Sequence, residues 1–147
     1  MSEKTITRNP DYKAYVLERV AKNKLMPAIG FHIDTVEEGL IEGSMTFAEM
    51  HQQQNGFLHG GISAALCDIV SGFASYSLVE KGQKVFTVEA KVSYYHKGNA
   101  DMIYAKGWVM KSGKRFHFCE SEVYEMHGEE KVIIAKGNCT MCVISED

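Results

Sequence analysis

Residues 60–79 form the longest segment of the chain whose composition fits a helix, of roughly five turns. Apolar residues cover much of the circumference of this helix, and small residues fill most of the remainder. A helix that is apolar nearly all round is a buried helix, because a surface helix carries a polar face. The rest of the chain must therefore surround this segment.

The segments on either side of the helix have the alternation and the β-branched residues of strands. Residues 28–50 predict two strands that meet at Glu38-Gly39, and the four strands expected after the helix are Val85–His96, Met102–Lys111, Arg115–Met126 and Lys131–Ile144. Consecutive strands joined by hairpins predict an α+β fold, in which an antiparallel sheet curls around the one central helix. The open edges of such a sheet favour pairing with a second copy, so we expect a dimer.

Residues 9–24 predict a short helix on the outside of the molecule, with Asn9 as the cap and Pro10 at the first helical position. The length of 147 residues fits a single domain that spans 1–147. No repeat, low-complexity tract or linker divides the sequence.

The overall charge gives no global attraction to nucleic acid or to an anionic membrane, since 16 basic and 19 acidic residues leave a net charge of −3. The first ten residues are polar, without the apolar core of a secretory signal, and the apolar helix is interrupted by Asp68. We therefore expect a cytoplasmic protein with no nucleic-acid partner and no membrane partner.

The four cysteines do not have the spacing of a metal site. Only Cys139 and Cys142 form a C-x-x-C pair, and positions three apart in a strand point to opposite faces. We expect structural thiols in a reducing compartment, and no metal.

Two glycines, Gly60 and Gly61, open the long helix. Without a Cβ they allow a ligand atom to approach backbone N–H groups at the positive end of the helix dipole, where an oxyanion would be stabilised. The same pair would also serve simply as a tight turn into the helix.

Asp68 lies in the middle of the same helix, where a charge is costly unless it is paired or used. It could bond to Ser71 or to a strand amide, or it could act as a general base or a nucleophile. Eight helical steps put Gly60 about 12 Å from Asp68, whereas reacting atoms lie about 3 to 3.5 Å apart. Two antiparallel copies of the helix would bring the glycines of one to the carboxylate of the other, which again favours a dimer with the site at its interface.

Three features occur together in this chain: the run Gly56-Phe57-Leu58-His59-Gly60-Gly61, a carboxylate eight residues after Gly60, and the segment TVEAKVSYY that starts at Thr87. Together they resemble the hotdog-fold thioesterases of the PaaI-like group, and the element order matches over nearly the whole chain. The resemblance implies hydrolysis of acyl-CoA thioesters by dimers, often paired into tetramers, without a metal or a bound cofactor.

The resemblance also implies roles for individual residues. The backbone amide of Gly60 would polarise the thioester carbonyl, Asp68 of the partner chain would activate water or attack the carbonyl, and Thr87 would help to position the water. Many relatives have an asparagine three residues before the loop glycine, where this chain has Gln53. Asn55 is adjacent to that glycine, and either amide could donate to the carbonyl.

His59 could serve as a base, but in this context we expect it to bond to the backbone and to shape the loop. Glu89 is expected on the same strand face as Thr87, where it would line the site or lie at the dimer seam. The candidate substrate-binding residues are Gly61, Phe57, Leu58 and Glu89.

Two rival functions use the same fold. The first is a binding protein that holds acyl-CoA or another lipid-like ligand without turnover. The second is a hydratase or dehydratase, which would need a carboxylate and a histidine acting together, and His59 is the histidine near the motif. Phe73, Tyr76 and Tyr94 would suit an aryl or an alkyl acyl group alike.

Overall fold

The computed structural model describes residues 6–145. Its helices are α1 (Tyr12–Lys22), α2 (Leu25–Ile29) and α3 (Gly60–Tyr76), and a short 3₁₀ turn covers Glu49–His51. Its strands are β1 (His32–Glu37), β2 (Leu40–Thr46), β3 (Gln83–Tyr94), β4 (Met102–Ser112), β5 (Phe116–His127) and β6 (Glu130–Ser145). The two strands expected before the central helix and the four expected after it are all present.

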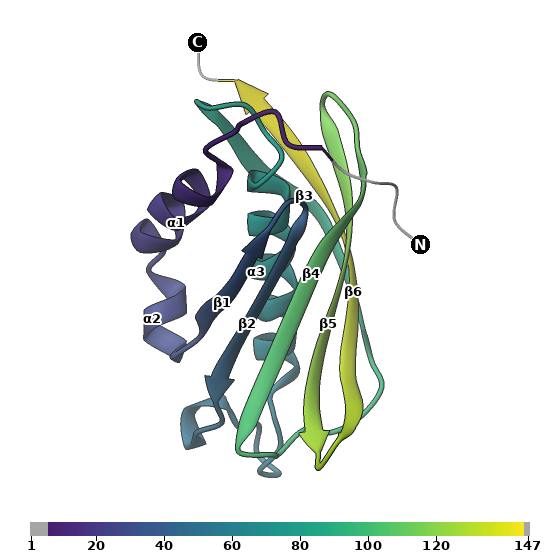
Figure 1. The fold of residues 1–147 in the computed structure, drawn as a ribbon. Coiled ribbons are helices and arrows are strands. Elements are labelled where there is room, and N and C mark those ends of the chain that lie inside the picture. Colours follow the sequence, from purple (N-terminus) through teal and green to yellow (C-terminus); the bar gives the residue numbers. More distant parts are fainter. Residues whose placement is uncertain (1–5, 146–147) are drawn as a thin grey trace.

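The strands of residues 6–145 form one antiparallel sheet in the order β1-β2-β4-β5-β6-β3, so β1 and β3 are its edges. α3 packs on one face of the sheet, which curves around it (Figure 1). α1 contacts α3 and β1 from outside this unit (Figure 1). The expected α+β fold, an antiparallel sheet wrapped around one central helix, is confirmed.

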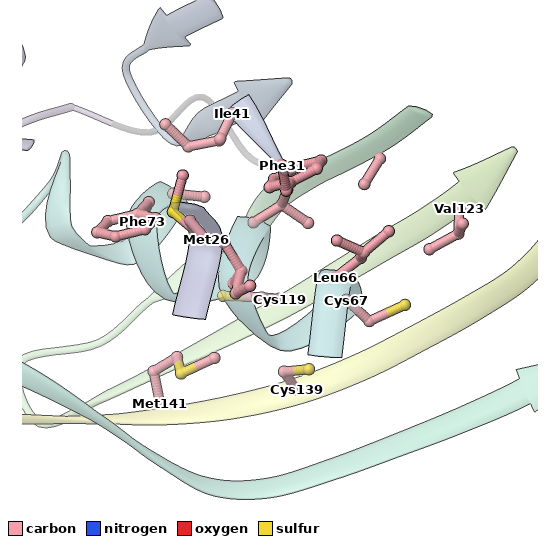
Figure 2. Close-up of a cluster of buried hydrophobic side chains, with 14 of the residues drawn as sticks. Met26, Phe31, Ile41, Leu66, Cys67, Phe73, Cys119, Val123, Cys139 and Met141 are labelled. Atoms are coloured by element: carbon pink, nitrogen blue, oxygen red, sulfur yellow. The ribbon is translucent and has the colours of Figure 1, made fainter. Parts of the chain in front are cut away.

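Strand alternation supplies the apolar surface that receives α3. On β4, Ile103, Ala105 and Val109 face the helix and are buried, whereas Tyr104, Lys106 and Trp108, which point to the other face, are half-buried. Leu66 (Figure 2) and Val70 of α3 belong to the same cluster of buried side chains. Burying each large apolar side chain contributes about 1.5 to 3 kcal/mol, so this interface holds the helix on the sheet.

Two glycines let the helix approach the backbone of the sheet closely. A Cβ on Gly107 would lie 2.6 Å from the carbonyl carbon of Val70, and a Cβ on Gly137 would lie 3.0 Å from the Cβ of Cys67. Real Cβ atoms are not found at the first distance, so α3 can lie this close to β4 only because position 107 is a glycine.

α3 ends at Tyr76, three residues before the end that the apolar pattern predicts. The hydroxyl of Ser77 donates to Ala74 O at 2.6 Å and accepts the Gly39 amide at 2.7 Å. Side-chain bonds to the backbone compete with helix continuation, and here they also tie the helix end to the turn between β1 and β2.

The N-terminal region differs from the expectation in two ways. Asn9 is not the cap of α1, because its side chain instead accepts the amide of Asp11 at 3.0 Å in a turn before the helix. The sequence pattern also missed α2, where a strand was expected to begin at residue 28. Asn23 caps α2 by accepting the amide of Met26 at 2.9 Å, and Gly30 ends it with a φ of 75°.

The cysteines of residues 6–145 are all free, and Cys67, Cys119 and Cys139 are buried side by side in the core (Figure 2). Burial raises the pKa of the Cys67 thiol to about 11 and that of Cys119 to about 12. Among the same residues no group of three potential ligands could hold a metal ion. Nor does any helix in this range have both the length and the apolar character needed to cross a membrane.

His117 lies on the helix-facing side of β5 and is 3% exposed. Its Nδ1 is 2.5 Å from the hydroxyl of Ser75 on α3. Burial, together with the positive charge of Arg8, lowers the pKa of His117 to about 4. The folded protein therefore keeps this ring neutral at pH values where an unfolded chain would protonate it.

We expect the free energy of unfolding to decrease as the pH falls from 6.5 towards 4. Over this range the unfolded chain binds a proton that the folded chain excludes, which removes up to about 3 kcal/mol. Urea denaturation at a series of pH values measures the effect. His117→Gln should give a shallower dependence, whereas His96→Gln, at an exposed ring, should keep the wild-type dependence; equal slopes in wild type and His117→Gln would contradict the assignment.

Candidate functional site

The loop that precedes α3 places the histidine and the two glycines at the start of the helix. His59 is the N-cap residue, and its Nδ1 accepts the amide of Gly61 at 2.8 Å. Because an amide can only donate, Nδ1 is the unprotonated nitrogen of the ring. The histidine thus bonds to the backbone and shapes the loop, as expected, and it occupies the amide of Gly61.

The amide of Gly60 is left as the donor at the helix start, since it has no acceptor among residues 6–145. The carbonyl of the same residue accepts the hydroxyl of Tyr94 at 2.9 Å. The Tyr94 ring also covers Gly60, where an added Cβ would lie 3.2 Å from a ring carbon. The Gly60 amide is therefore fixed in place at the positive end of the helix dipole.

His51 holds this loop in place through hydrogen bonds, a role that sequence reasoning did not identify. The ring is 2% exposed, accepts the amide of Ala48 at 2.9 Å through Nδ1, and donates from Nε2 to Ile29 O at 2.7 Å. The carbonyl of His51 accepts the amide of His59 at 2.8 Å. The buried ring thus fixes the residue that holds the N-cap.

A buried carboxylate holds residues 99–100, which follow the residue that bonds to this loop. Sequence reasoning missed this carboxylate as well. Glu125 is 1% exposed, and its Oε2 accepts the amides of Asn99 at 3.0 Å and Ala100 at 2.9 Å. Its Oε1 accepts Nε2 of His127 at 2.8 Å. Burial raises the pKa of Glu125, but the bonds to the two amides and to His127 together hold it below its ordinary value.

This carboxylate is connected to the start of α3 by one further bond. The carbonyl of Gly98, next to the clamped amides, accepts the amide of Leu58 at 2.7 Å. Leu58 is 7% exposed and packs in the core, two residues before Gly60. The expected substrate-binding residue Leu58 therefore anchors the loop, because its side chain is enclosed by its own protomer.

The central carboxylate is half-buried and faces a cavity. Oδ1 of Asp68 accepts the hydroxyl of Thr87 at 2.6 Å, so its partner is Thr87 on β3 and not Ser71. Both side chains line a cavity of about 360 Å³ between α1, α3 and β3. The hydrogen bond orients one oxygen of the carboxylate, and the acid is not sealed inside the core.

Glu89 does not share a face with Thr87, and that expectation was wrong. Thr87 pairs with Met141 on β6, whereas Glu89 pairs with the next residue, Thr140. Val88 is the extra residue of a β-bulge, which turns the rest of the strand by one face. Glu89 therefore lies on the outer face of the sheet, away from Asp68.

The loop before α3 contains both candidate amide side chains. Oε1 of Gln53 accepts the backbone amide of Asn55, and the amide of Gln53 donates to Phe57 O at 2.8 Å. The oxygen of Gln53 is thus used within the turn, which leaves its NH₂ group as the end that can donate. Asn55 is exposed, and Phe57 is half-buried beneath Nζ of Lys97, 4.8 Å from the ring centroid.

β3 contacts the start and the middle of the central helix and is itself an edge of the sheet. Thr87 near its start bonds to Asp68, and Tyr94 at its end bonds to Gly60. Its residues Phe86 and Val88 are 53% and 60% exposed. An edge strand with exposed apolar residues is a surface suited to pairing.

Comparison with known proteins gives a consistent match. Residues 55–131, more than half of the chain, match the model of the Thioesterase superfamily. The chain is 26% identical over 112 residues to the proofreading thioesterase EntH of Klebsiella pneumoniae, covering 76% of this chain and 82% of that protein. It is 24% identical over 119 residues to a 1,4-dihydroxy-2-naphthoyl-CoA hydrolase of Listeria monocytogenes, covering 81% and 94%.

Solved structures share the fold. A thioesterase family protein from Silicibacter pomeroyi superimposes with a TM-score of 0.88 at 29% identity, covering 92% of this chain and 99% of that one. The E. coli PaaI protein from the phenylacetic acid degradation operon superimposes with a TM-score of 0.81 at 18% identity, covering 91% and 94%.

We expect Glu125→Ala to loosen the loop that leads into α3. The amides of Asn99 and Ala100 would lose their acceptor, at a cost of about 2 to 4 kcal/mol, and hydrogen exchange should accelerate at both and at Leu58. Glu125→Gln keeps an oxygen acceptor and should restore most of the protection. Glu129→Ala, in the exposed turn nearby, is the control; unchanged exchange at Leu58 in Glu125→Ala would refute the connection.

Proposed function

The chain belongs to the thioesterase superfamily, and we propose that it hydrolyses acyl-CoA thioesters to the free acid and CoA. One observation carries the proposal: the helix that begins with the Gly60 amide also bears Asp68, which Thr87 orients towards a cavity. The family match, and the similarity to a relative named as a CoA-thioester hydrolase, support this chemistry.

In the proposed reaction, the amide of Gly60 donates to the thioester carbonyl and stabilises the negative charge that develops on its oxygen. Asp68 takes a proton from a water molecule while the water oxygen bonds to the carbonyl carbon. The carbon–sulfur bond then breaks, and the proton passes to the departing thiolate. If Asp68 attacks the carbonyl directly, the carbon–sulfur bond breaks and the thiolate leaves as the anhydride forms, and water must afterwards cleave that anhydride and supply the proton to the thiolate.

We propose that the two groups of one site come from different protomers. On a single helix, Gly60 and Asp68 are about 12 Å apart, which is too far for one carbonyl to reach both. Pairing of the exposed edge strand β3 with its copy would supply the missing half of each site, and burial of Phe86 and Val88 would favour that pairing.

The positions of the two β3 contacts indicate the register of this pairing. If antiparallel pairing is centred on Lys91 and the bulge residue Val88 stays unpaired, Thr87 of one protomer lies opposite Tyr94 of the partner subunit. Thr87 is bonded to Asp68, and Tyr94 is bonded to Gly60. This register brings the carboxylate of one chain towards the Gly60 amide of the other.

We expect Asp68→Asn to reduce the release of free thiol from acyl-CoA by at least about 100-fold, because it removes the base and keeps an oxygen for the Thr87 hydroxyl. The assay uses alkyl and aryl acyl-CoAs, with the melting temperature as the measure of folding. Asp101→Asn, at an exposed loop carboxylate, is the control and should keep full activity. Wild-type protein that releases no thiol from any acyl-CoA, even if the CoA esters raise its melting temperature, would exclude hydrolysis.

We expect Gly60→Pro to lower kcat by about 100-fold or more, because proline lacks the N–H that stabilises the oxyanion. Proline is compatible with a first helical position, and His59 before it is already extended at ψ 133°. Gly60→Ala is the matched control: it adds a Cβ towards Tyr94 but keeps the amide.

Mixed dimers of two inactive variants then test where the two halves of the site lie. When Asp68→Ala and Gly60→Pro chains are refolded together, half of the dimers are mixed and each has one intact site if the halves come from different chains. This predicts recovery of about a quarter of the wild-type activity. No recovery from demonstrably mixed dimers would place both groups of a site in one chain and refute the proposal.

A further inference from the structure

We infer that the cavity beside Asp68 selects acyl groups whose far end carries an oxygen acceptor, such as a carboxylate or a phenolic hydroxyl, and that Arg19 binds this oxygen. The inference rests on the proposed hydrolysis at Asp68 and adds the class of acyl group. Arg19 on α1 and Asp68 on α3 both line the cavity.

The guanidinium of Arg19 is held in one position. Its central carbon lies 4.2 Å from the ring centroid of Tyr15 and 4.9 Å from that of Tyr76. One of its nitrogens donates to the Tyr15 hydroxyl, which itself donates to Gln83 O at 2.6 Å and accepts the Gly82 amide at 3.1 Å. A cation fixed between two rings loses little conformational freedom on binding a ligand.

Most of the hydrogen-bonding capacity of this guanidinium is unused. Arginine has five N–H donors; Nε of Arg19 is buried without a partner within residues 6–145, so the N–H groups of its terminal nitrogens that Tyr15 does not use are the ones left for a ligand. No carboxylate in this range forms an ion pair with Arg19. A charged side chain that lines a cavity and has no counter-ion there is a group that can bind and orient a polar ligand.

Part of the wall between the two charged ends is apolar, and Lys22 and Asn23 also line the cavity. Ile69, Phe73 and Val85 line it, and Gly72 has no heavy atom within 4 Å of where its Cβ would lie. A volume of 360 Å³ is within the range of small-molecule sites. The cavity therefore fits a chain or a ring with a polar atom at each end.

The spacing of the two ends sets the length of the acyl group. Tyr76, on which Arg19 is stacked, follows Asp68 by eight residues of α3, or about 12 Å along the helix. About 3 Å at each end is taken up by the attacking water and by the hydrogen bond to Arg19. The remaining distance of roughly 6 Å suits an acyl chain of about six carbons or a para-substituted ring.

The experiment compares substrates that differ only at the far end. Adipoyl-CoA is paired with hexanoyl-CoA, and 4-hydroxyphenylacetyl-CoA with phenylacetyl-CoA, and kcat/KM is measured for each. We expect the oxygen-terminated member of at least one pair to be favoured by about tenfold or more, the size of a charge-assisted hydrogen bond.

Arg19→Met keeps the apolar stem between the tyrosine rings and removes the charge. It should reduce the preference to about twofold or less, whereas Arg19→Lys should retain part of it. Lys13→Met, at an exposed cation on the same helix, is the matched control and should leave the preference unchanged. Melting temperatures identify any variant that fails to fold, and Arg19→Lys then provides the comparison.

Three outcomes would overturn the inference. The first is equal kcat/KM within both substrate pairs in the wild-type protein. The second is a preference that survives Arg19→Met. The third is a rise in KM of similar size for both members of a pair, which would place Arg19 on the CoA phosphates. A protein that hydrolyses hexanoyl-CoA without any preference disproves the role of Arg19 alone, whereas one that hydrolyses no acyl-CoA disproves the proposed function.

Discussion

The seating of α3 against the sheet determines where every part of the site lies. The contact is close because Gly107 and Gly137 have no side chains where Val70 and Cys67 meet the strands. Apolar burial from β4 and its neighbours holds the helix at this depth. Since Gly60 and Asp68 are both on α3, their separation is fixed by helix geometry and cannot be shortened by local adjustment.

β3 contacts both groups of the proposed site and is the strand through which we propose that two chains pair. It orients Asp68 through Thr87 near one end and covers Gly60 with Tyr94 at the other. Because β3 is also an edge of the sheet, the same strand that contacts the two groups is available for pairing. The arrangement of the loop before α3 depends on two buried polar groups, His51 and Glu125, whose bonds lie within the protomer.

The sequence predicted the order of the elements, the central helix and the placement of Gly60 at its start and Asp68 at its middle, because these depend on local composition and spacing. It did not predict the outward turn of Glu89, because the bulge at Val88 is set by the register with β6. It also missed Glu125, whose position in an alternating strand looks like any other inward residue. The contribution of Arg19 could not be predicted, since it depends on how α1 packs on Tyr76 and Gln83, which are distant in sequence. α2 was missed because its cap, Asn23, was assigned to the end of the preceding helix.

The burial of three thiols has a chemical consequence for a protein proposed to generate free CoA. Thiol–disulfide exchange requires a thiolate that can reach the other sulfur, and Cys67, Cys119 and Cys139 are enclosed and held in the protonated form. Under oxidising conditions, free CoA released at the site would therefore not form mixed disulfides with these three buried thiols. Cys142, which is half-buried, is the more accessible sulfur and would be the first to carry such an adduct.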